Sequence, residues 1–447
     1  MATPSLAGPT FASPAQYRAD APVMDRVLWQ VTAPHRPAGA ALDEPLVCDV
    51  AIVGAGFTGL RAALALAEAG SRVAVFDAGE VGHGAAGRSG GQVNPMLPVA
   101  HPEDLRRAVG EERFRKLAEL SLGSADELFD LVRRYKIACD ARRHGWLRVD
   151  HSPAARARAR AAAQAWNAFG AGFEFLDGEE LQGLTGSPAY GSATLSPRGG
   201  AVQPLALVRG LAGAAEAAGA RIYTHSAVRA LKRVDQRWTM TAAGQPVTAD
   251  RVLLATNGYT DDLLAGLKRS VLPLTSIQIA TEPLSEDEIG PVLPGGHTIS
   301  DTRRLIMYAR REPDRRVVFG GIGYRRPLGR EGGFRWLFRD AARIFPSIRP
   351  ESWRYRWGGH IALTEDRLPH FHEPAPGLLA GLGYNGRGVA MSLAMGRVLA
   401  ERALGADPAT LPFAVSPIRR MAFRDTQVLG AGLAMAVLRL RDNLEFR

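Results

Sequence analysis

The clearest pattern of apolar and polar positions lies between residues 50 and 77 and predicts a strand, a helix and a second strand. Val50–Val53 is a short apolar run rich in β-branched residues, typical of a strand buried on both faces. A segment rich in Ala and Leu follows without proline and ends at Gly70, as a helix with a glycine stop does. A second apolar run, Arg72–Phe76, ends in Asp77. This order predicts one strand–helix–strand unit of an α/β fold.

Three glycines join the first strand to the helix with the spacing G-x-G-x-x-G. Gly54 allows a tight turn, Gly56 lets a pyrophosphate approach the backbone, and Gly59 lets the helix pack closely on the strand. The helix start presents free N–H groups to the phosphates, and the Asp77 carboxylate can accept both ribose hydroxyls. Because Asp77 would repel a ribose 2′-phosphate, the unit indicates a Rossmann-like domain for NAD or FAD. The motif alone does not separate these two cofactors.

The glycine pattern further along the chain bears on that choice. A simple NAD domain would continue with alternating strands and helices, but residues 79–95 form a long glycine-rich loop that contains Arg88. Later, Val252–Ala255 predicts a buried parallel strand that ends in a Thr-Asn-Gly turn, and residues 383–388 form a second glycine loop before a helix. Ligands bind at this carboxyl edge of an open α/β sheet. N–H groups at a helix start could stabilise negative charge on a ring such as a reduced flavin.

Five motifs in order carry a resemblance to a known family: VGAGFTGL, GHGAAGRSGGQ, LLATNGY, WGGHIALTEDRLP and GYNGRGVAMS. Together they resemble the D-amino-acid oxidase (DAO) superfamily of FAD-dependent oxidoreductases. The GRSGGQ loop is similar to the GRNGGQ form of the branch that includes gamma-glutamylputrescine oxidase. The resemblance extends from about residue 25 to residue 445 and implies FAD as the cofactor. It also implies a Rossmann-like FAD-binding domain with a second, antiparallel-sheet substrate domain, α/β in class and α+β overall.

The resemblance implies FAD contacts from the first turn, the acidic strand end, the glycine-rich loop, the adenine-side strand, the second turn and the last glycine loop. The corresponding residues are Gly54, Ala55, Gly56, Phe57, Thr58, Gly59, Asp77, Ala78, Gly87, Arg88, Ser89, Gly90, Gly91, Gln92, Val228, Thr256, Asn257, Gly258, Gly359, Asn385, Gly386, Arg387, Gly388 and Val389. Sarcosine-oxidase-like members tether FAD through a cysteine near the position of Gly359 or His360. This chain has none there, so we expect noncovalent FAD.

The same comparison leaves the electron acceptor open. Sarcosine-oxidase-like members use a lysine close to the flavin N5 to speed the reaction with oxygen, and the corresponding strand RRVVFGGIGY has no lysine. Oxygen or another electron acceptor therefore remains possible.

The chain is expected to divide into four parts, two of them discontinuous. They are a lead-in at 1–45, an FAD-binding domain at 46–101, 196–267 and 351–415, a substrate domain at 102–195 and 268–350, and a C-terminal extension at 416–447. The substrate domain would roof the flavin with strands such as PLTSIQIATEPL and RLIMYARR.

Amine oxidation requires little acid–base machinery. The amine lone pair assists hydride loss from the adjacent carbon to the flavin N5, and water hydrolyses the resulting imine. Tyr308 and Arg310 alternate on RLIMYARR and share one strand face with Arg304, so an inward arginine could pair with a substrate carboxylate, although a solvent-facing edge is equally compatible. We take His360, Tyr308 and Arg310 as catalytic candidates. The substrate would be a small amine or amino acid; oxidation of a CH–OH group, as in a hydroxy acid, and a non-catalytic assembly flavoprotein remain alternatives.

The composition of the chain narrows the possible partners, metal sites and cellular location of the protein. The net charge of +10 comes from basic residues spread along the chain, and the Arg-rich segment 154–166 is typical of a solvated helix rather than a nucleic-acid site. Two cysteines without C-x-x-C spacing and no H-E-x-x-H predict no metal. The N-terminus shows no signal-peptide pattern, so we expect a cytoplasmic protein. The apolar segment 428–438 predicts a packed C-terminal helix, with interfacial membrane contact as the second interpretation.

Overall fold

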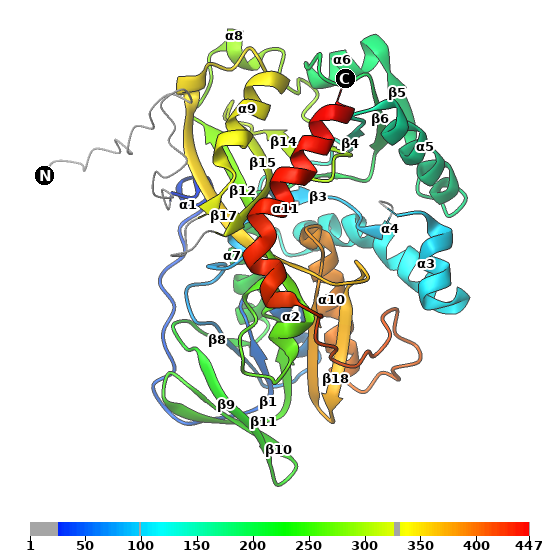
Figure 1. The fold of residues 1–447 in the computed structure, drawn as a ribbon. Helices are drawn as coiled ribbons and strands as arrows, with labels where there is room; N and C mark the ends of the chain where they lie inside the picture. The colour runs from blue at the N-terminus through cyan, green and yellow to red at the C-terminus, as the bar shows by residue number, and fades with distance from the viewer. Residues whose placement is uncertain (1–25, 98–99, 326–330, 447) are drawn as a thin grey trace, which may run out of the picture.

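The computed structural model describes residues 26–97, 100–325 and 331–446, and two large sheets dominate them. Figure 1 shows one sheet in the lower half of the molecule and the other in the upper half, with the C-terminal helix running down the front of the upper half. The lower sheet carries the predicted dinucleotide-binding unit, so we call it the FAD sheet. The upper one is the roof sheet.

The FAD sheet has eight strands, and its central pairs are parallel. In spatial order they are β18 (His370–Ala375), β19 (Leu378–Leu382), β11 (Gln245–Leu254), β1 (Leu46–Val53), β2 (Val73–Phe76) and β8 (Arg221–Tyr223), with β10 (Arg237–Ala242) and β9 (Val228–Val234) added antiparallel to β11. Val50–Val53 of β1 lies between β2 and β11 and is buried, because helices cover one face and the β9–β10–β11 ribbon covers the other. The predicted strand–helix–strand unit is therefore present.

Three helices pack together on this sheet: α2 (Phe57–Glu68), α7 (Pro204–Ala217) and α10 (Gly388–Ala403). Helix α2 contacts both of the others, and their Ala- and Leu-rich faces form one apolar core with α4 (Glu111–Arg134). Because the axes of α2 and α10 approach closely, a Cβ at Gly396 of α10 would strike the backbone of Thr58 in α2. Glycine at this position permits the contact.

The roof sheet has nine strands, and its pairs are antiparallel apart from β4 with β13. In spatial order they are β17 (Trp353–Leu363), β12 (Leu272–Thr281), β15 (Val317–Arg325), β14 (Met307–Arg311), β13 (Thr298–Asp301), β4 (Trp146–Val149), β6 (Ser192–Ser196) and β5 (Glu174–Asp177), with β16 (Glu331–Gly332) on β15. A short ribbon of β3 (Gln92–Val93) and β7 (Gly200–Ala201) joins the two halves.

Two expected boundaries need correction. Residues 353–363 were assigned to the FAD-binding domain, but they form β17, which pairs with β12 along its length in the roof sheet. Residue 196 was the expected start of an FAD-domain segment and instead ends roof strand β6. Sequence pattern missed both because a strand's pairing partner depends on distant segments.

The remaining helices surround this frame. They are α1 (Leu28–Thr32), α3 (Pro102–Val109), α5 (Pro153–Asn167), α6 (Gly178–Thr185), α8 (Glu286–Ile289), α9 (Phe334–Ile344) and α11 (Arg424–Glu445). Helix α5 is the predicted solvated helix. Ser152 caps it by accepting from Ala155 N, and its inward face consists of Ala155, Ala159, Ala162, Ala163 and Trp166. Trp29 of α1 packs edge-on against Trp357, 5.8 Å between ring centroids, and so joins this part of the lead-in to the body.

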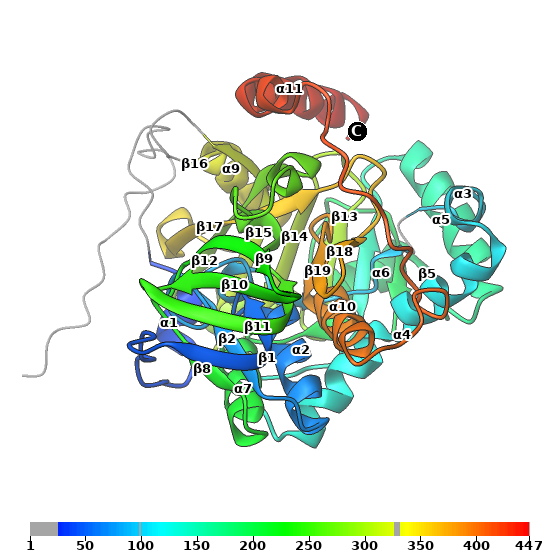
Figure 2. The same cartoon turned by 90° about the horizontal axis from the view of Figure 1, so that it is seen from below.

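Helix α11 lies on the outside of the molecule, as Figure 2 shows from below. Only Met435 and Asp442 of its residues are buried. Among the helices that the structure describes, none has both the length and the apolar composition required to cross a bilayer.

Candidate active site

A cavity of about 840 Å³ lies between the FAD sheet and the roof sheet. Its floor comes from the carboxyl ends of β1, β2 and β11, and roof residues on β12, β14 and β15 close it from above. The volume is within the range of cofactor pockets, and the position is where open α/β sheets bind ligands.

The turn between β1 and α2 has the backbone that a pyrophosphate requires. Gly54 has φ +111°, a conformation that favours glycine, and a Cβ at Gly59 would collide with the Gly54 carbonyl oxygen. These are the roles that the motif predicts for its first and third glycines. Asp77 at the end of β2 accepts hydrogen bonds from Ala55 N (2.7 Å) and Gly79 N (2.9 Å). Burial raises the pKa of Asp77 in spite of these two donors.

The glycine-rich loop passes beneath the roof strand that carries Tyr308. The Tyr308 ring lies between Gly90 and Gly320, and a Cβ at Gly90 would be 2.6 Å from the ring. The phenol oxygen is 2.8 Å from Ser276 Oγ, and burial raises the pKa of Tyr308. Glycine at both positions therefore lets the tyrosine sit at the cavity wall.

Arg310 does not reach the cavity, which corrects the expectation that it could meet a substrate. It is fully buried, and Glu312 accepts two hydrogen bonds from its guanidinium, at 2.5 and 2.9 Å. Its Nη1 donates to the carbonyl oxygens of Gly90, Gly91 and Val202. Arg310 thus shares a strand face with Tyr308, as predicted, but it holds the glycine-rich loop in place.

The second turn and the last glycine loop meet on the opposite side of the cavity. Asn257 Oδ1 accepts from Gly383 N at 2.9 Å, and Asn385 Oδ1 accepts from Thr364 N at 2.9 Å. Both asparagines have positive φ, 42° and 50°. Tyr384 lies 2.7 Å from Thr58 of the first turn, hydroxyl to hydroxyl. These contacts join the two loops to the first turn.

His360 lies on β17 at the cavity wall. Its backbone N donates to the Tyr259 hydroxyl at 3.3 Å, and the two rings are 5.1 Å apart. A Cβ at Gly258 would be 2.6 Å from the His360 carbonyl oxygen, so this glycine permits the close approach of the second turn to β17.

Arg387 lines one end of the cavity without a carboxylate partner among the described residues. The Arg387 guanidinium lies over the Trp146 ring, 4.6 Å from its centroid, and Arg148 on β4 is its charged neighbour. Within the described part of the chain, no hydrogen bond or ion pair holds either guanidinium. Burial, with a contribution from Arg148, lowers the pKa of Arg387 to about 9. Burial also lowers the pKa of Arg148, although Asp150 opposes the shift.

Most of the predicted site residues line this one cavity. Those that do not are Gly59, Gly87, Gly258 and Arg310. The three glycines lie just behind the wall at close backbone contacts, because a Cβ on any of them would meet a carbonyl oxygen. Arg304 also lines the cavity, but it lies in the loop before β14, which begins at Met307.

Helix α11 supplies part of the wall that sequence analysis missed. Gly430, Ala431, Ala434, Met435 and Leu438 face the cavity. Their small and apolar side chains at helical spacing were a usable signal, but the pattern does not say what such a face covers.

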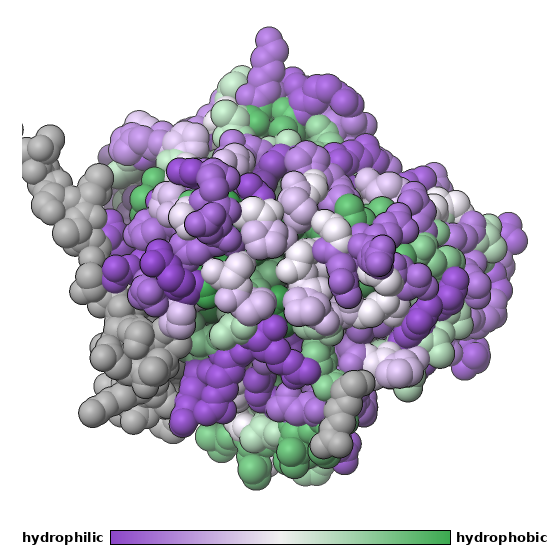
Figure 3. Space-filling model, turned by 90° about the horizontal axis from the view of Figure 1, so that it is seen from above, coloured by the Kyte–Doolittle hydropathy of each residue, from purple (hydrophilic) through white to green (hydrophobic). Residues whose placement is uncertain are grey.

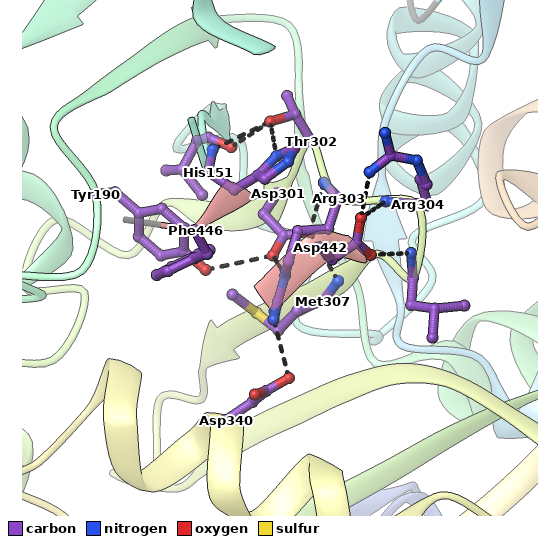
Figure 4. A network of polar contacts seen from close by, with 12 residues as sticks. His151, Tyr190, Asp301, Thr302, Arg303, Arg304, Met307, Asp340, Asp442 and Phe446 are labelled. Atoms are coloured by element: carbon purple, nitrogen blue, oxygen red, sulfur yellow. Dashed lines mark hydrogen bonds and ion pairs between the residues drawn. The ribbon is translucent and has the colours of Figure 1, made fainter. Parts of the chain in front are cut away.

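The buried carboxylate of Asp442 fixes the end of α11 to the cavity wall. It accepts from Arg304 N (3.2 Å), Arg304 Nη1 (2.9 Å) and Leu305 N (2.9 Å), as Figure 4 shows. The neighbouring Arg303 pairs with Asp301 and Asp340. The helix is therefore a fixed part of the site.

The residues at the cavity fit a dinucleotide with a planar ring. The first turn offers N–H groups and an acid for one end, and the loops around Gly90 and Gly386 offer backbone for the other. Among the described residues, no cluster of three or more His, Cys, Asp or Glu is arranged to hold a metal ion.

Comparisons with known proteins agree with this geometry. The model of the DAO family, FAD dependent oxidoreductases, matches residues 49–402. Gamma-glutamylputrescine oxidoreductase of Escherichia coli K12 is 33% identical over 368 residues, 80% of this chain and 84% of that protein. Glycine oxidase of Geobacillus kaustophilus is 27% identical over 378 residues, 79% of this chain and 92% of that protein.

Solved structures share the fold. The crystal structure of glycine oxidase from Geobacillus kaustophilus superposes with a TM-score of 0.69 at 22% identity, over 84% of this chain and all of that one. L-proline dehydrogenase from P. horikoshii superposes with a TM-score of 0.67 at 18% identity, over 83% of this chain and all of that one. With the family match over most of its length, the chain belongs to the DAO family of FAD-dependent oxidoreductases.

Proposed function

We propose that this protein oxidises the C–N bond of a small amine or amino acid that carries a carboxylate. The observation that carries the proposal is Arg387, a half-buried guanidinium at the cavity wall that no acid of the described residues pairs with; Arg148 beside it adds a second positive charge. Buried charges are normally paired, because an unpaired charge in a low dielectric is costly. An anionic substrate group would supply the missing partner and bind through charge-assisted hydrogen bonds.

The similar proteins support the same class of reaction. Their printed names include gamma-glutamylputrescine oxidoreductase, glycine oxidase and iminodiacetate oxidase, each named for a compound with a C–N bond and a carboxylate. The cavity between the two sheets is large enough for a cofactor and a small substrate together.

FAD would be held by the first turn, Asp77, the glycine-rich loop, Val228, the second turn and the loop around Gly386. When bound, it supplies the hydride acceptor for oxidation of the carbon next to the amine. We propose noncovalent attachment, since Cys48 and Cys139 are both buried outside the cavity lining. Flavin released by denaturation, with none left on the precipitated chain, is the expected result.

The chain's own residues orient the substrate and keep the site dry. Arg387 would hold the substrate carboxylate, and the neighbouring charge of Arg148 would strengthen that attraction. Tyr308 and His360 border the reacting region from the roof strands β14 and β17. Helix α11 excludes water from above. Such positioning is the main contribution a protein makes to hydride transfer.

The electron acceptor is oxygen or another oxidant. The chain's lysines are Lys116, Lys136, Lys232 and Lys268, and none of them lines the cavity. This arrangement favours a dehydrogenase that passes electrons to an acceptor other than oxygen. The two unpaired cysteines favour a cytoplasmic location for the reaction.

The test is an anaerobic titration of the holoprotein, followed by its visible flavin spectrum. Substrates are offered as matched pairs with and without the carboxylate: glycine with methylamine, sarcosine with dimethylamine, and gamma-glutamylputrescine with putrescine. We expect bleaching by a carboxylate member and little by its partner, and air then reports on oxygen. Bleaching by lactate or glycolate alone would replace this proposal with CH–OH oxidation. Tightly bound FAD that no compound reduces would indicate a non-catalytic flavoprotein.

A further inference from the structure

Helix α11 exposes an apolar stripe on the side that faces away from the body. Leu429, Leu433, Val437, Leu440 and Leu444 follow one another at spacings of three and four, which places them on one helix face. Their exposed fractions run from 48% to 86%. The exposed ring of Phe423 extends the stripe at the N-terminal end of the helix. Soluble surfaces rarely expose so many large apolar side chains together.

The opposite face of α11 is already occupied, so the stripe cannot turn inward. Met435 and Leu438 face the cavity, and Asp442 is bonded to the backbone of residues 304 and 305. Arg439 holds the same side by pairing with Asp340 of α9 at 2.9 Å. The orientation of the helix is therefore fixed with its apolar stripe outward.

Exposed arginines outnumber exposed acids on α11 and the segments next to it. Among the described residues of α9, α11 and the segment 416–423, the exposed arginines are Arg335, Arg339, Arg343, Arg419, Arg420 and Arg441. The exposed acid in the same set is Asp425, and it pairs with Arg269 and Arg424. Figure 3 shows green, apolar atoms at the lower edge of the molecule, where α11 lies, beside a purple, polar area.

We propose that this face docks on an anionic lipid surface, with α11 lying in the plane of the membrane. An apolar helix face with arginines around it matches the boundary between acyl chains and anionic headgroups. A second copy of this chain is a poorer occupant, because a two-fold contact through the stripe would bring the same arginines together. A ridge on the outside of the molecule also inserts into a soft surface without needing a matching groove.

Helix α11 lies outside the segment that the family model matches. The family model ends at residue 402, whereas α11 begins at Arg424. The same helix forms one wall of the cavity, so the docked protein would hold its active site next to the membrane surface.

The test is co-sedimentation of the full-length holoprotein with vesicles of phosphatidylcholine, alone or mixed with phosphatidylglycerol. We expect binding to the mixed vesicles and weaker binding at high salt. Leu433→Asp with Leu440→Asp should lower the partition coefficient by about tenfold or more, since two apolar side chains leave the interface. Leu404→Asp, an exposed leucine at the end of α10, is the matched control and should bind as the wild type does.

The charge contribution is tested separately with Arg335→Gln and Arg339→Gln, and with Arg107→Gln and Arg158→Gln as a control pair on α3 and α5. Flavin absorbance and circular dichroism of each variant show that it is folded. The proposal is overturned if the wild type does not bind vesicles that contain phosphatidylglycerol, or if the stripe variants bind them as strongly as the wild type does. A dimer in light scattering that Leu433→Asp and Leu440→Asp convert to monomer would also overturn it, in favour of a second copy of this chain.

Discussion

Replacing Arg387 by methionine should weaken catalysis and strengthen the fold at the same time. The guanidinium has no acid partner among the described residues, and burial and Arg148 lower its pKa from the usual range of an arginine to about 9. At pH 7 the folded protein therefore carries a charge that the fold disfavours by on the order of 5 kcal/mol. This cost is present at all pH values below about 9 and is relieved as pH rises from there toward the usual range of an arginine.

Methionine removes that cost but also loses the cation–π contact with Trp146, worth roughly 1 kcal/mol. We expect the free energy of unfolding without substrate to rise by about 1–3 kcal/mol. A substrate carboxylate loses charge-assisted hydrogen bonds worth about 1.5–3 kcal/mol, so kcat/KM should fall by roughly 10- to 150-fold. An amine that lacks the carboxylate should be affected much less.

The assays are thermal or chemical unfolding and steady-state kinetics with a carboxylate substrate and its carboxylate-free partner. Arg158→Met, an exposed arginine on α5, serves as the control and should change neither. A drop in stability with unchanged kcat/KM would refute the reasoning and make Arg387 structural. An equal loss of kcat/KM for both substrates would instead indicate that the Arg387 side chain acts on the flavin rather than on the substrate carboxylate.

Three further outcomes are expected. Asp77→Asn leaves one acceptor oxygen for the two donors Ala55 N and Gly79 N and removes the negative charge. It should raise the FAD dissociation constant about tenfold or more, measured by flavin fluorescence on dilution; an unchanged constant contradicts the proposed ribose site. Glu312→Gln breaks the buried pair with Arg310 and should lower the free energy of unfolding, measured in denaturant, by about 3–5 kcal/mol. An unchanged midpoint of the unfolding transition would contradict a stabilising role of this pair. Burial raises the pKa of Asp150 to about 6, so stability contributed by its neutral form is lost as pH rises from about 4 to 6. Asp150→Asn should flatten stability over that interval, and an unaltered pH profile would argue against the burial effect.

The backbone-binding part of the site was predictable from sequence because its contacts are local. Glycine spacing at Gly54 and Gly59 and the acid at Asp77 depend only on one turn and the strand beside it. The alternation of side chains along the strand correctly predicts that Tyr308 and Arg310 share one face. It does not predict how close each side chain comes to the cavity. Arg310 does not reach the cavity because Glu312, two residues further along the chain and just past the end of β14, pairs with its guanidinium.

The other parts of the site depend on long-range packing. Arg148 and Arg387 are far apart in the chain, and they meet because β4 joins the roof sheet beside β13. The strand at 353–363 carries apolar residues and glycines that suit either sheet, so its place was decided by pairing with β12. The cavity-facing residues of α11 show helical spacing in the sequence, but this spacing does not say which surface they pack against.

The order in which the walls of the cavity occur along the chain affects synthesis. Its floor begins with β1 at residue 46, and its last wall, α11, ends at residue 445. A ribosome must therefore synthesise every residue from 46 to 445 before these surfaces can enclose the cavity. A chain that stops before residue 424 would lack the wall formed by α11, and that side of the cavity would be open to water.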